Sequence, residues 1–348
     1  MRYDDKRLSY MGRIDINDDG AAFYWPSSQV TAVFKGTYAD ITVMNRTAYG
    51  IITIGYIIDG RKGRIPFSQA DDGQFRKIRI VSDLDPEKEH TLTIFKRQAA
   101  NHAFTISDID CDGEFLPCEP EYRLKLEFYG DSVSAGECTE ADDFAGSCDP
   151  CNHMWIYDNS YTWQCARLLG ASFHNTSQGG IAVFDDTGYF HWPKMIGMES
   201  VYDKVCYFPE GGEITKWDFG RYIPDVVVFA LGQNDKHNGI TDADDIDIYD
   251  PAVRRRWKDG YIKLIRDVTV HYGDVKIVMI TTVLMHDPEW DAAIDEIVTE
   301  LRGQGYDIHH FLFTGNGAVT PGHPRTSEHA VMAKELAAFI GSLTGIES

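Results

Sequence analysis

The hydrophobic pattern of this 348-residue chain changes once along its length. From Gly12 to about Leu116, short runs of alternating apolar and polar residues follow one another, and turn signals such as Asp59-Gly60 and Asp72-Gly73 separate them. A period of two is typical of half-buried strands, and no helical period competes with it. We therefore predict a jelly-roll-like β-sandwich for residues 1–116. The predicted strands are Ala22–Trp25, Val30–Phe34, Ala39–Met44, Gly50–Ile58, Phe75–Val81, Thr91–Phe95 and Phe104–Ile109.

Apolar strands alternate with helical stretches in the rest of the chain. The segment Cys111–Glu121, which is rich in proline and acidic residues, has the composition of a linker. Beyond it, the alternation predicts a parallel sheet covered by helices, so residues 117–348 are expected to form a flavodoxin-like three-layer α/β/α domain. The predicted strands are Leu124–Tyr129, Val226–Leu231 and Val275–Val283, and the predicted helices are Asn159–Leu169, Arg254–His271 and Ser327–Leu343.

The charge and the cysteines narrow the class of partner and the compartment. A formal net charge of −21, from 54 acidic and 33 basic residues, repels nucleic acid and anionic membranes, whereas neutral carbohydrate is not repelled. No apolar run has the length of a membrane span, and the charged N-terminus has no apolar signal core. Seven cysteines, an odd number, do not form a complete disulfide framework. We expect a cytoplasmic protein, or a secreted one if a leader has been removed, and its oligomeric state is not predicted.

The first strand of the second part ends in Gly130-Asp131-Ser132, on a sharp exit from a buried run. Reactive residues of a parallel sheet gather at the carboxyl ends of its strands. A serine hydroxyl there becomes a nucleophile when a base accepts its proton and when donors stabilise the oxyanion. The alternative interpretation of this tripeptide is a plain turn.

Two later strand ends offer oxyanion donors. Gly179-Gly180 follows an apolar stretch, and the N–H of a glycine there can approach a ligand closely. Asn234 follows the run Val226–Leu231 and can supply a side-chain N–H. The alternatives are turn chemistry for the two glycines and a helix N-cap for Asn234.

A histidine near the C-terminus is the candidate base. Proline after His323 bars helix at that point and helps to fix the loop, so the imidazole can reach Ser132. His329 lies at the start of the following helix and is expected to be a structural hydrogen-bonding residue.

Taken in chain order, Ser132, Gly180, Asn234 and His323 resemble the four blocks of the SGNH or GDSL hydrolases, over about residues 124–343. A β-sandwich placed before such a domain resembles carbohydrate esterase family 2, as do the segments Met11–Ile14, Phe23–Pro26 and Phe34–Thr37. The resemblance implies a serine esterase that removes acetyl groups from xylan, mannan and related sugars. It implies Ser132 as nucleophile, His323 as base and then acid, and the Ser132 N–H, the Gly180 N–H and the Asn234 side chain as oxyanion donors.

One position departs from the superfamily pattern. An aspartate usually stands three residues before the histidine, and Thr320 occupies that place here. A backbone carbonyl or a more distant acid would then have to orient His323, and chemistry persists without the acid because the base and the oxyanion hole remain. This departure leaves room for a noncatalytic carbohydrate-binding protein, and a short-chain lipase or thioesterase is a further alternative.

No cofactor and no metal are expected. Cys148 and Cys151, with His153 nearby, form a single CxxC motif that is weak evidence for zinc. The sugar-stacking candidates are Trp155, Trp192 and Trp290, of which Trp290 is the best placed because it follows a strand end, and Trp217 is a weaker one.

Overall fold

The structure is a computed structural model, and it describes residues 1–50, 52–141, 159–237, 246–281, 284, 287–315 and 322–347. The chain forms two compact units. The first unit comprises Met1–Glu121 together with Lys204–Lys216, and the second comprises Tyr122–Asp203 together with Trp217–Ser348. The short segment Lys204–Lys216 therefore joins the N-terminal unit from far along the sequence, which no sequence signal indicated. A domain boundary after residue 116 stays a prediction.

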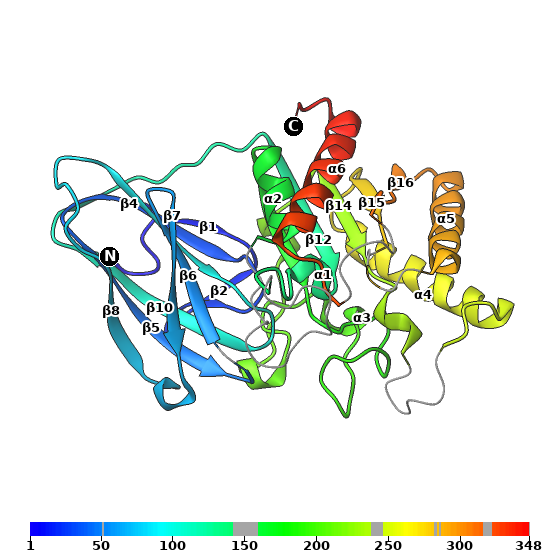
Figure 1. The fold of residues 1–348 in the computed structure, drawn as a ribbon, viewed down its shortest axis with the longest axis horizontal. Coiled ribbons are helices and arrows are strands. Elements are labelled where there is room, and N and C mark those ends of the chain that lie inside the picture. The colour runs from blue at the N-terminus through cyan, green and yellow to red at the C-terminus, as the bar shows by residue number, and fades with distance from the viewer. Residues whose placement is uncertain are drawn as a thin grey trace. The chain divides into compact units, whose positions relative to one another are not determined.

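The first unit is a sandwich of two antiparallel sheets (Figure 1). One sheet has the order β1-β4-β9-β6-β7, with β11 pairing with β4, and the other has the order β2-β3-β10-β5-β8. Phe23, Phe34 and Phe104 belong to the apolar core of this unit, which confirms the predicted β-sandwich. The strands are β1 Ser9–Met11, β2 Ile14–Asn17, β3 Gly20–Phe23, β4 Gln29–Lys35, β5 Ala39–Thr47, β6 Ile52–Ile58, β7 Arg61–Phe67, β8 Phe75–Val81, β9 His90–Lys96, β10 His102–Cys111 and β11 Glu114–Leu116.

Strand β7 was not predicted, for a physical reason. It lies at the edge of its sheet and carries Arg61, Lys62, Arg64 and Pro66. Charged residues and proline are tolerated on an edge strand, because one side of its backbone has no partner strand. They hide the period of two that marked the inner strands.

The second unit contains a parallel sheet in the order β13-β12-β14-β15-β16. In chain order this is the flavodoxin-like arrangement 2-1-3-4-5, and it confirms the predicted α/β fold. The strands are β12 Leu124–Gly130, β13 Ala171–Ser177, β14 Val226–Ala230, β15 Lys276–Met279 and β16 Ile308–His310. The helices are α1 Ser132–Ala135, α2 Tyr161–Leu168, α3 Met198–Val201, α4 Pro251–Thr269, α5 Pro288–Gly303 and α6 Thr326–Thr344. The short 3-10 helices among the described residues are η1 Gln69–Asp71, η3 Pro209–Gly211, η4 Phe219–Arg221 and η5 Asn234–Lys236.

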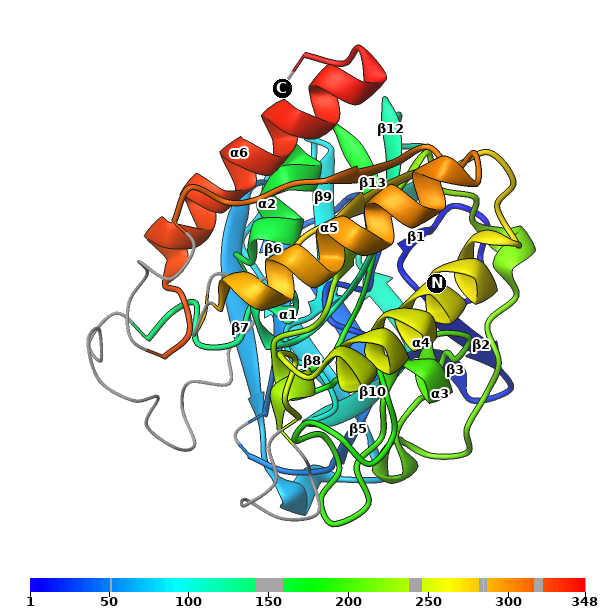
Figure 2. The ribbon, with the colours of Figure 1, turned by 90° about the vertical axis from the view of Figure 1, so that its right-hand side faces the viewer.

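Helices cover both faces of this sheet (Figures 1 and 2). Helix α2 packs against α6, and α4 packs against α5. The central strands are buried on both faces, so every residue of β14 is buried and the strand is a continuous apolar run. No helix in the described part of the chain is long and apolar enough to cross a membrane.

The carboxyl ends of the three strands that precede the predicted motifs lie next to one another. Gly130, the last residue of β12, pairs with Ser177 on one side and with Ala230 on the other. The segments that carry Ser132, Gly180 and Asn234 therefore all leave the sheet at the carboxyl ends of its strands, which is called the carboxyl edge of the sheet below.

Candidate active site

Ser132 is the first residue of α1, directly after the exit from β12. Asp131 caps this short helix, and its Oδ1 accepts a hydrogen bond from the Val133 N–H at 3.0 Å. Gly130 makes the turn sterically possible, because a Cβ there would lie 2.3 Å from Ser134 Oγ. The backbone N–H of Ser132 lies in the first turn of the helix, where an N–H has no intrahelical acceptor. It donates to no group among the described residues. That N–H is thus available to an oxyanion.

The loop after β13 brings Gly180 to the same edge. Gln178 N–H donates to the Gly130 carbonyl at 3.1 Å, which ties the end of β13 to the end of β12. Gly180 has φ +75°, a conformation that favours glycine, and its carbonyl accepts from Tyr189 N–H at 2.8 Å. The Gly180 N–H has no acceptor in the described part of the chain. It is a second available donor.

Asn234 joins the loops after β13 and β14. Its Nδ2 donates to the carbonyl of Ile181 at 3.0 Å, next to Gly180 in sequence. Asn234 is the first residue of η5 and makes no capping bond, so the N-cap interpretation is wrong. A side-chain amide carries two N–H donors, and one remains for a ligand.

Asp235 is a supporting residue that the sequence analysis did not assign. Its Oδ1 accepts from Val183 N–H and from Trp257 Nε1, both at 3.0 Å. It thereby fixes the loop after β13 and helix α4 to the end of β14. Burial raises the pKa of Asp235 to about 6. An acid in the loop that follows a wholly apolar strand was the available signal.

The His323 loop is fastened to the segment that follows α1. Thr326 N–H donates to the Thr139 carbonyl at 2.8 Å, and Arg325 Nε donates to the Ala141 carbonyl at 2.9 Å. Arg325 Nη1 also donates to the carbonyl of His323. These bonds place His323 within electrostatic reach of Asp131, the neighbour of Ser132.

Two buried groups near the imidazole have displaced pKa values. Burial raises the pKa of Asp131 to about 7, and the Val133 N–H and His323 oppose that rise. Burial, with a smaller contribution from His323, lowers the pKa of His329 to about 3. His329 Nδ1 accepts from Tyr161 N–H at 3.1 Å, so this histidine is a structural hydrogen-bonding residue. Among the described residues, Ser132 Oγ forms no hydrogen bond, so a contact between Ser132 and His323 belongs to the proposal below.

The predicted sugar-stacking tryptophans differ in how exposed their rings are. Trp290 is buried, and its ring packs edge-on against Trp257 with centroids 5.0 Å apart. Trp217 is buried as well. Neither ring has a free face for a sugar, so both are core residues. Trp192 is 79% exposed and remains available for stacking. Several candidates lie outside the described residues, namely Trp155, Cys148, Cys151, His153 and Thr320.

A parallel sheet in flavodoxin-like order, with these motifs after the carboxyl ends of its strands, is the arrangement that the resemblance to the SGNH hydrolases predicts. In the part of the chain that the structure describes, no three His, Cys, Asp or Glu side chains gather in a way that could hold a metal ion.

Comparison with known proteins places the chain more closely. Residues 10–120 match the family model of the carbohydrate esterase 2 N-terminal domain. The acetylxylan esterase / glucomannan deacetylase of Cellvibrio japonicus is 25% identical over 339 residues, which cover 95% of this chain and 87% of that protein. The cellulase/esterase CelE of Acetivibrio thermocellus is 27% identical over 98% of this chain, which spans 40% of that protein's length.

The fold agrees with a solved structure of a family two carbohydrate esterase from Clostridium thermocellum in complex with cellohexaose. The TM-score is 0.82 at 24% identity, over 97% of this chain and 99% of that one. In its N-terminal domain and in its fold, the chain is therefore similar to the family 2 carbohydrate esterases.

Proposed function

We propose that this chain is a carbohydrate acetyl esterase that removes O-acetyl groups from plant-wall polysaccharides or oligosaccharides through an acyl-serine intermediate. The observation that supports the proposal is that three candidate donors follow the carboxyl ends of three adjacent strands. They are the Ser132 N–H, the Gly180 N–H and the second N–H of the Asn234 amide. A set of fixed donors of this kind stabilises the oxyanion of a tetrahedral intermediate.

The proposed reaction is a double displacement. Ser132 Oγ attacks the acetyl carbonyl while His323 accepts the hydroxyl proton, and the carbonyl oxygen becomes an oxyanion held by the three donors. Collapse of the intermediate breaks the bond to the sugar oxygen, which receives the proton from His323. Water then attacks the acyl-serine with His323 as base again, and acetate leaves.

In this proposal, Asp131 takes over one role of the aspartate that is absent at position 320, namely electrostatic stabilisation of the His323 imidazolium. It is a buried carboxyl group in electrostatic contact with His323, and its Oδ2 has no hydrogen-bond partner in the described part of the chain. When ionised, it favours the imidazolium that forms as Ser132 attacks. A backbone carbonyl can still fix the orientation of the ring.

The activities for which the two relatives are named support the acyl group and the substrate class. One is an acetylxylan esterase and glucomannan deacetylase, and the other combines cellulase and esterase. Five described cysteines are free thiols, which supports a reducing compartment as part of the proposal. In that location the substrate would be acetylated oligosaccharides rather than intact wall polymer.

The proposal is tested with nitrophenyl esters of increasing acyl length. We expect the wild type to prefer the acetate over the butyrate and octanoate esters, and Ser132→Ala to lose the activity. Better turnover of the longer esters would favour the lipase or thioesterase alternative. Binding of xylan or mannan without hydrolysis of any ester would favour the noncatalytic alternative.

A further inference from the structure

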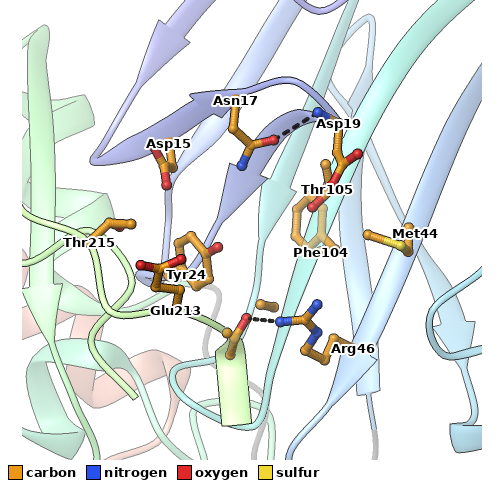
Figure 3. A pocket seen from close by; sticks show the side chains of 13 residues that line it. Asp15, Asn17, Asp19, Tyr24, Met44, Arg46, Phe104, Thr105, Glu213 and Thr215 are labelled. Carbon is orange, nitrogen blue, oxygen red and sulfur yellow. Dashed lines mark hydrogen bonds between the residues drawn. The ribbon is translucent and has the colours of Figure 1, made fainter. Parts of the chain in front are cut away.

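A pocket of about 270 Å³ lies within the N-terminal unit (Figure 3). Its floor is the face of the sheet β2-β3-β10-β5-β8 that points away from the sandwich core. Ala103, Phe104 and Thr105 of β10 line it, and of these three only Phe104 also belongs to the core cluster. The hollow is therefore formed by the face of β10 opposite to its core face.

The cross-strand register explains why this face is hollow. Thr105 pairs with Ala22 of β3 on one side and with Met44 of β5 on the other. Ala103 pairs with Arg46 of β5. Directly opposed residues project from the same face of a sheet, so the small side chains of Ala22, Ala103 and Thr105 lie beside the long side chains of Met44 and Arg46 on this face.

The segment Lys204–Lys216 builds one wall. Gly211, Gly212, Glu213 and Thr215 line the pocket. Arg46 Nη1 donates to the Gly211 carbonyl at 2.8 Å. Gly212 has φ +136°, and a Cβ there would lie 2.5 Å from Arg46 Nη1, so this close approach requires glycine.

An aromatic stack and a further hydrogen bond anchor the start of the same segment. The ring of Trp25 stacks on Tyr207 with centroids 3.6 Å apart, and Trp25 Nε1 donates to the Lys204 carbonyl at 3.1 Å. The wall is consequently fixed in place before any ligand arrives, which lowers the ordering cost of binding.

The pocket presents polar groups that are not used inside the protein. The carboxylates of Asp15, Asp19 and Glu213 accept no hydrogen bond and form no ion pair among the described residues. Asn17 Oδ1 accepts from the Asp19 N–H at 3.0 Å, which leaves the Asn17 amide N–H groups available. The remaining N–H groups of Arg46 are available in the same way.

This lining selects the chemistry of the ligand. Three carboxylates against one guanidinium repel an anion. Sugar hydroxyl groups donate to carboxylates and accept from Arg46 and Asn17, so a neutral polyol satisfies both kinds of group. The volume lies near the small end of the range for ligand sites and suits a short stretch of sugar chain.

We propose that this pocket is a second, noncatalytic carbohydrate-binding site, built by the outer sheet face of the N-terminal unit and the Lys204–Lys216 segment. It shares only the class of ligand with the proposed function. The test of this site measures binding of sugars that carry no acetyl group. The binding-site proposal can therefore fail while the esterase proposal holds, and the esterase proposal can fail while the binding-site proposal holds.

The experiment is calorimetric titration of the full chain with unacetylated cellohexaose, xylohexaose and mannohexaose. The test variant is Asp15→Ala with Glu213→Ala, which removes two carboxylates that have no described partner. The matched control is Asp18→Ala with Glu119→Ala, two exposed carboxylates of the same unit that do not line the pocket. A second variant, Thr105→Tyr, fills the hollow without changing charge. Hydrolysis of 4-nitrophenyl acetate and the unfolding temperature report that each variant is folded.

We expect the wild type and the control to bind at least one of the three oligosaccharides. The test variant should weaken that binding by about tenfold or more, which corresponds to the loss of one charge-assisted hydrogen bond. Thr105→Tyr should weaken binding because its ring occupies the hollow, and both variants should leave ester hydrolysis unchanged. The affinity should be the same at low and high salt, since the ligand is neutral. The proposal is overturned if no oligosaccharide binds, if both variants bind like the wild type, or if salt abolishes binding.

Discussion

The side chain of Asn234 donates a hydrogen bond to the backbone carbonyl of Ile181, with Nδ2 and O 3.0 Å apart. This bond holds the loop after β14 against the loop after β13, so two candidate oxyanion donors are fixed relative to each other. In the same region, Asp235 Oδ1 accepts from the Val183 N–H. Donors that are held in place before substrate binds do not have to be reorganised during the reaction.

Asn234→Ala tests the side-chain donor. Removal of one oxyanion donor should lower kcat by about 10²–10³-fold with a small change in KM, because the bond strengthens only in the transition state. Steady-state hydrolysis of 4-nitrophenyl acetate measures both constants. Asn17→Ala, an exposed amide in the other unit, is the control and should hydrolyse the ester like the wild type. Full kcat in Asn234→Ala would remove this residue from the mechanism.

Gly180→Ala tests the backbone donor. At φ +75° a side chain is strained, and the new Cβ would lie 3.0 Å from Tyr189 Cβ. We expect a stability loss of about 1 kcal/mol together with a large fall in kcat, since the N–H moves. Gly60→Ala is a matched control, because Gly60 has φ +80° and an added Cβ there would meet no atom within 4 Å. It should lose similar stability and keep its activity, and an equal loss of kcat in both variants would contradict the assignment.

Asp131→Asn tests the pH dependence of stability. Because burial raises the folded-state pKa from 3.8 to about 7, the protonated form is favoured in the folded state. The contribution of protonated Asp131 to the stability of the fold is complete below the unfolded-state pKa and is lost as the pH rises through about 7. Asparagine keeps the acceptor for the Val133 N–H and does not titrate, so the variant should gain stability relative to the wild type as the pH rises through this window. The gain should be on the order of 1–3 kcal/mol.

Unfolding in denaturant at a series of pH values measures this difference. The control is Asp218→Asn, in which an exposed capping aspartate that accepts from Gly220 N–H is replaced. Its stability is compared with that of the wild type at the same pH values, as a reference for a substitution away from the strand ends. A pH-independent difference for Asp131→Asn would show that Asp131 does not titrate there.

His329→Gln tests the pH dependence of stability for a buried group whose pKa is lowered rather than raised. Burial lowers the pKa of His329 from 6.5 to about 3, so the neutral ring is favoured in the folded state. Its contribution is present above pH 6.5 and is lost as the pH falls toward 3. Glutamine can still accept from the Tyr161 N–H, so the variant should lose less stability than the wild type on acidification. His271→Gln, an exposed histidine, is the control. An identical acid response of the wild type and His329→Gln would contradict the account.

Much of the fold was predictable because its inner strands carry clear hydrophobic patterns. Alternation in β4 and the continuous apolar run of β14 both match their observed burial. The edge strand β7 was missed because charges and a proline replace that pattern. Helix α5 was missed as well, although Asp287 and Pro288 provide a capping signal at its start.

The candidate site was predictable at the strand ends but not beyond them. Ser132, Gly180 and Asn234 each follow a strand, so sequence position alone indicates that all three lie at the carboxyl ends of the parallel strands. Trp290 also follows a strand, but its contact with Trp257 depends on how α4 and α5 pack, which no local pattern encodes. The Lys204–Lys216 wall of the N-terminal pocket is a long-range contact of the same kind.

The central claim is that Ser132 carries the acyl group removed from an acetylated carbohydrate. Release of acetate from acetylated xylan and acetylated glucomannan should be measured for the wild type, for Ser132→Ala and for Ser342→Ala, an exposed serine on α6. We predict release by the wild type and by Ser342→Ala, and none above background by Ser132→Ala. Acetate release by Ser132→Ala at the wild-type rate would contradict the account.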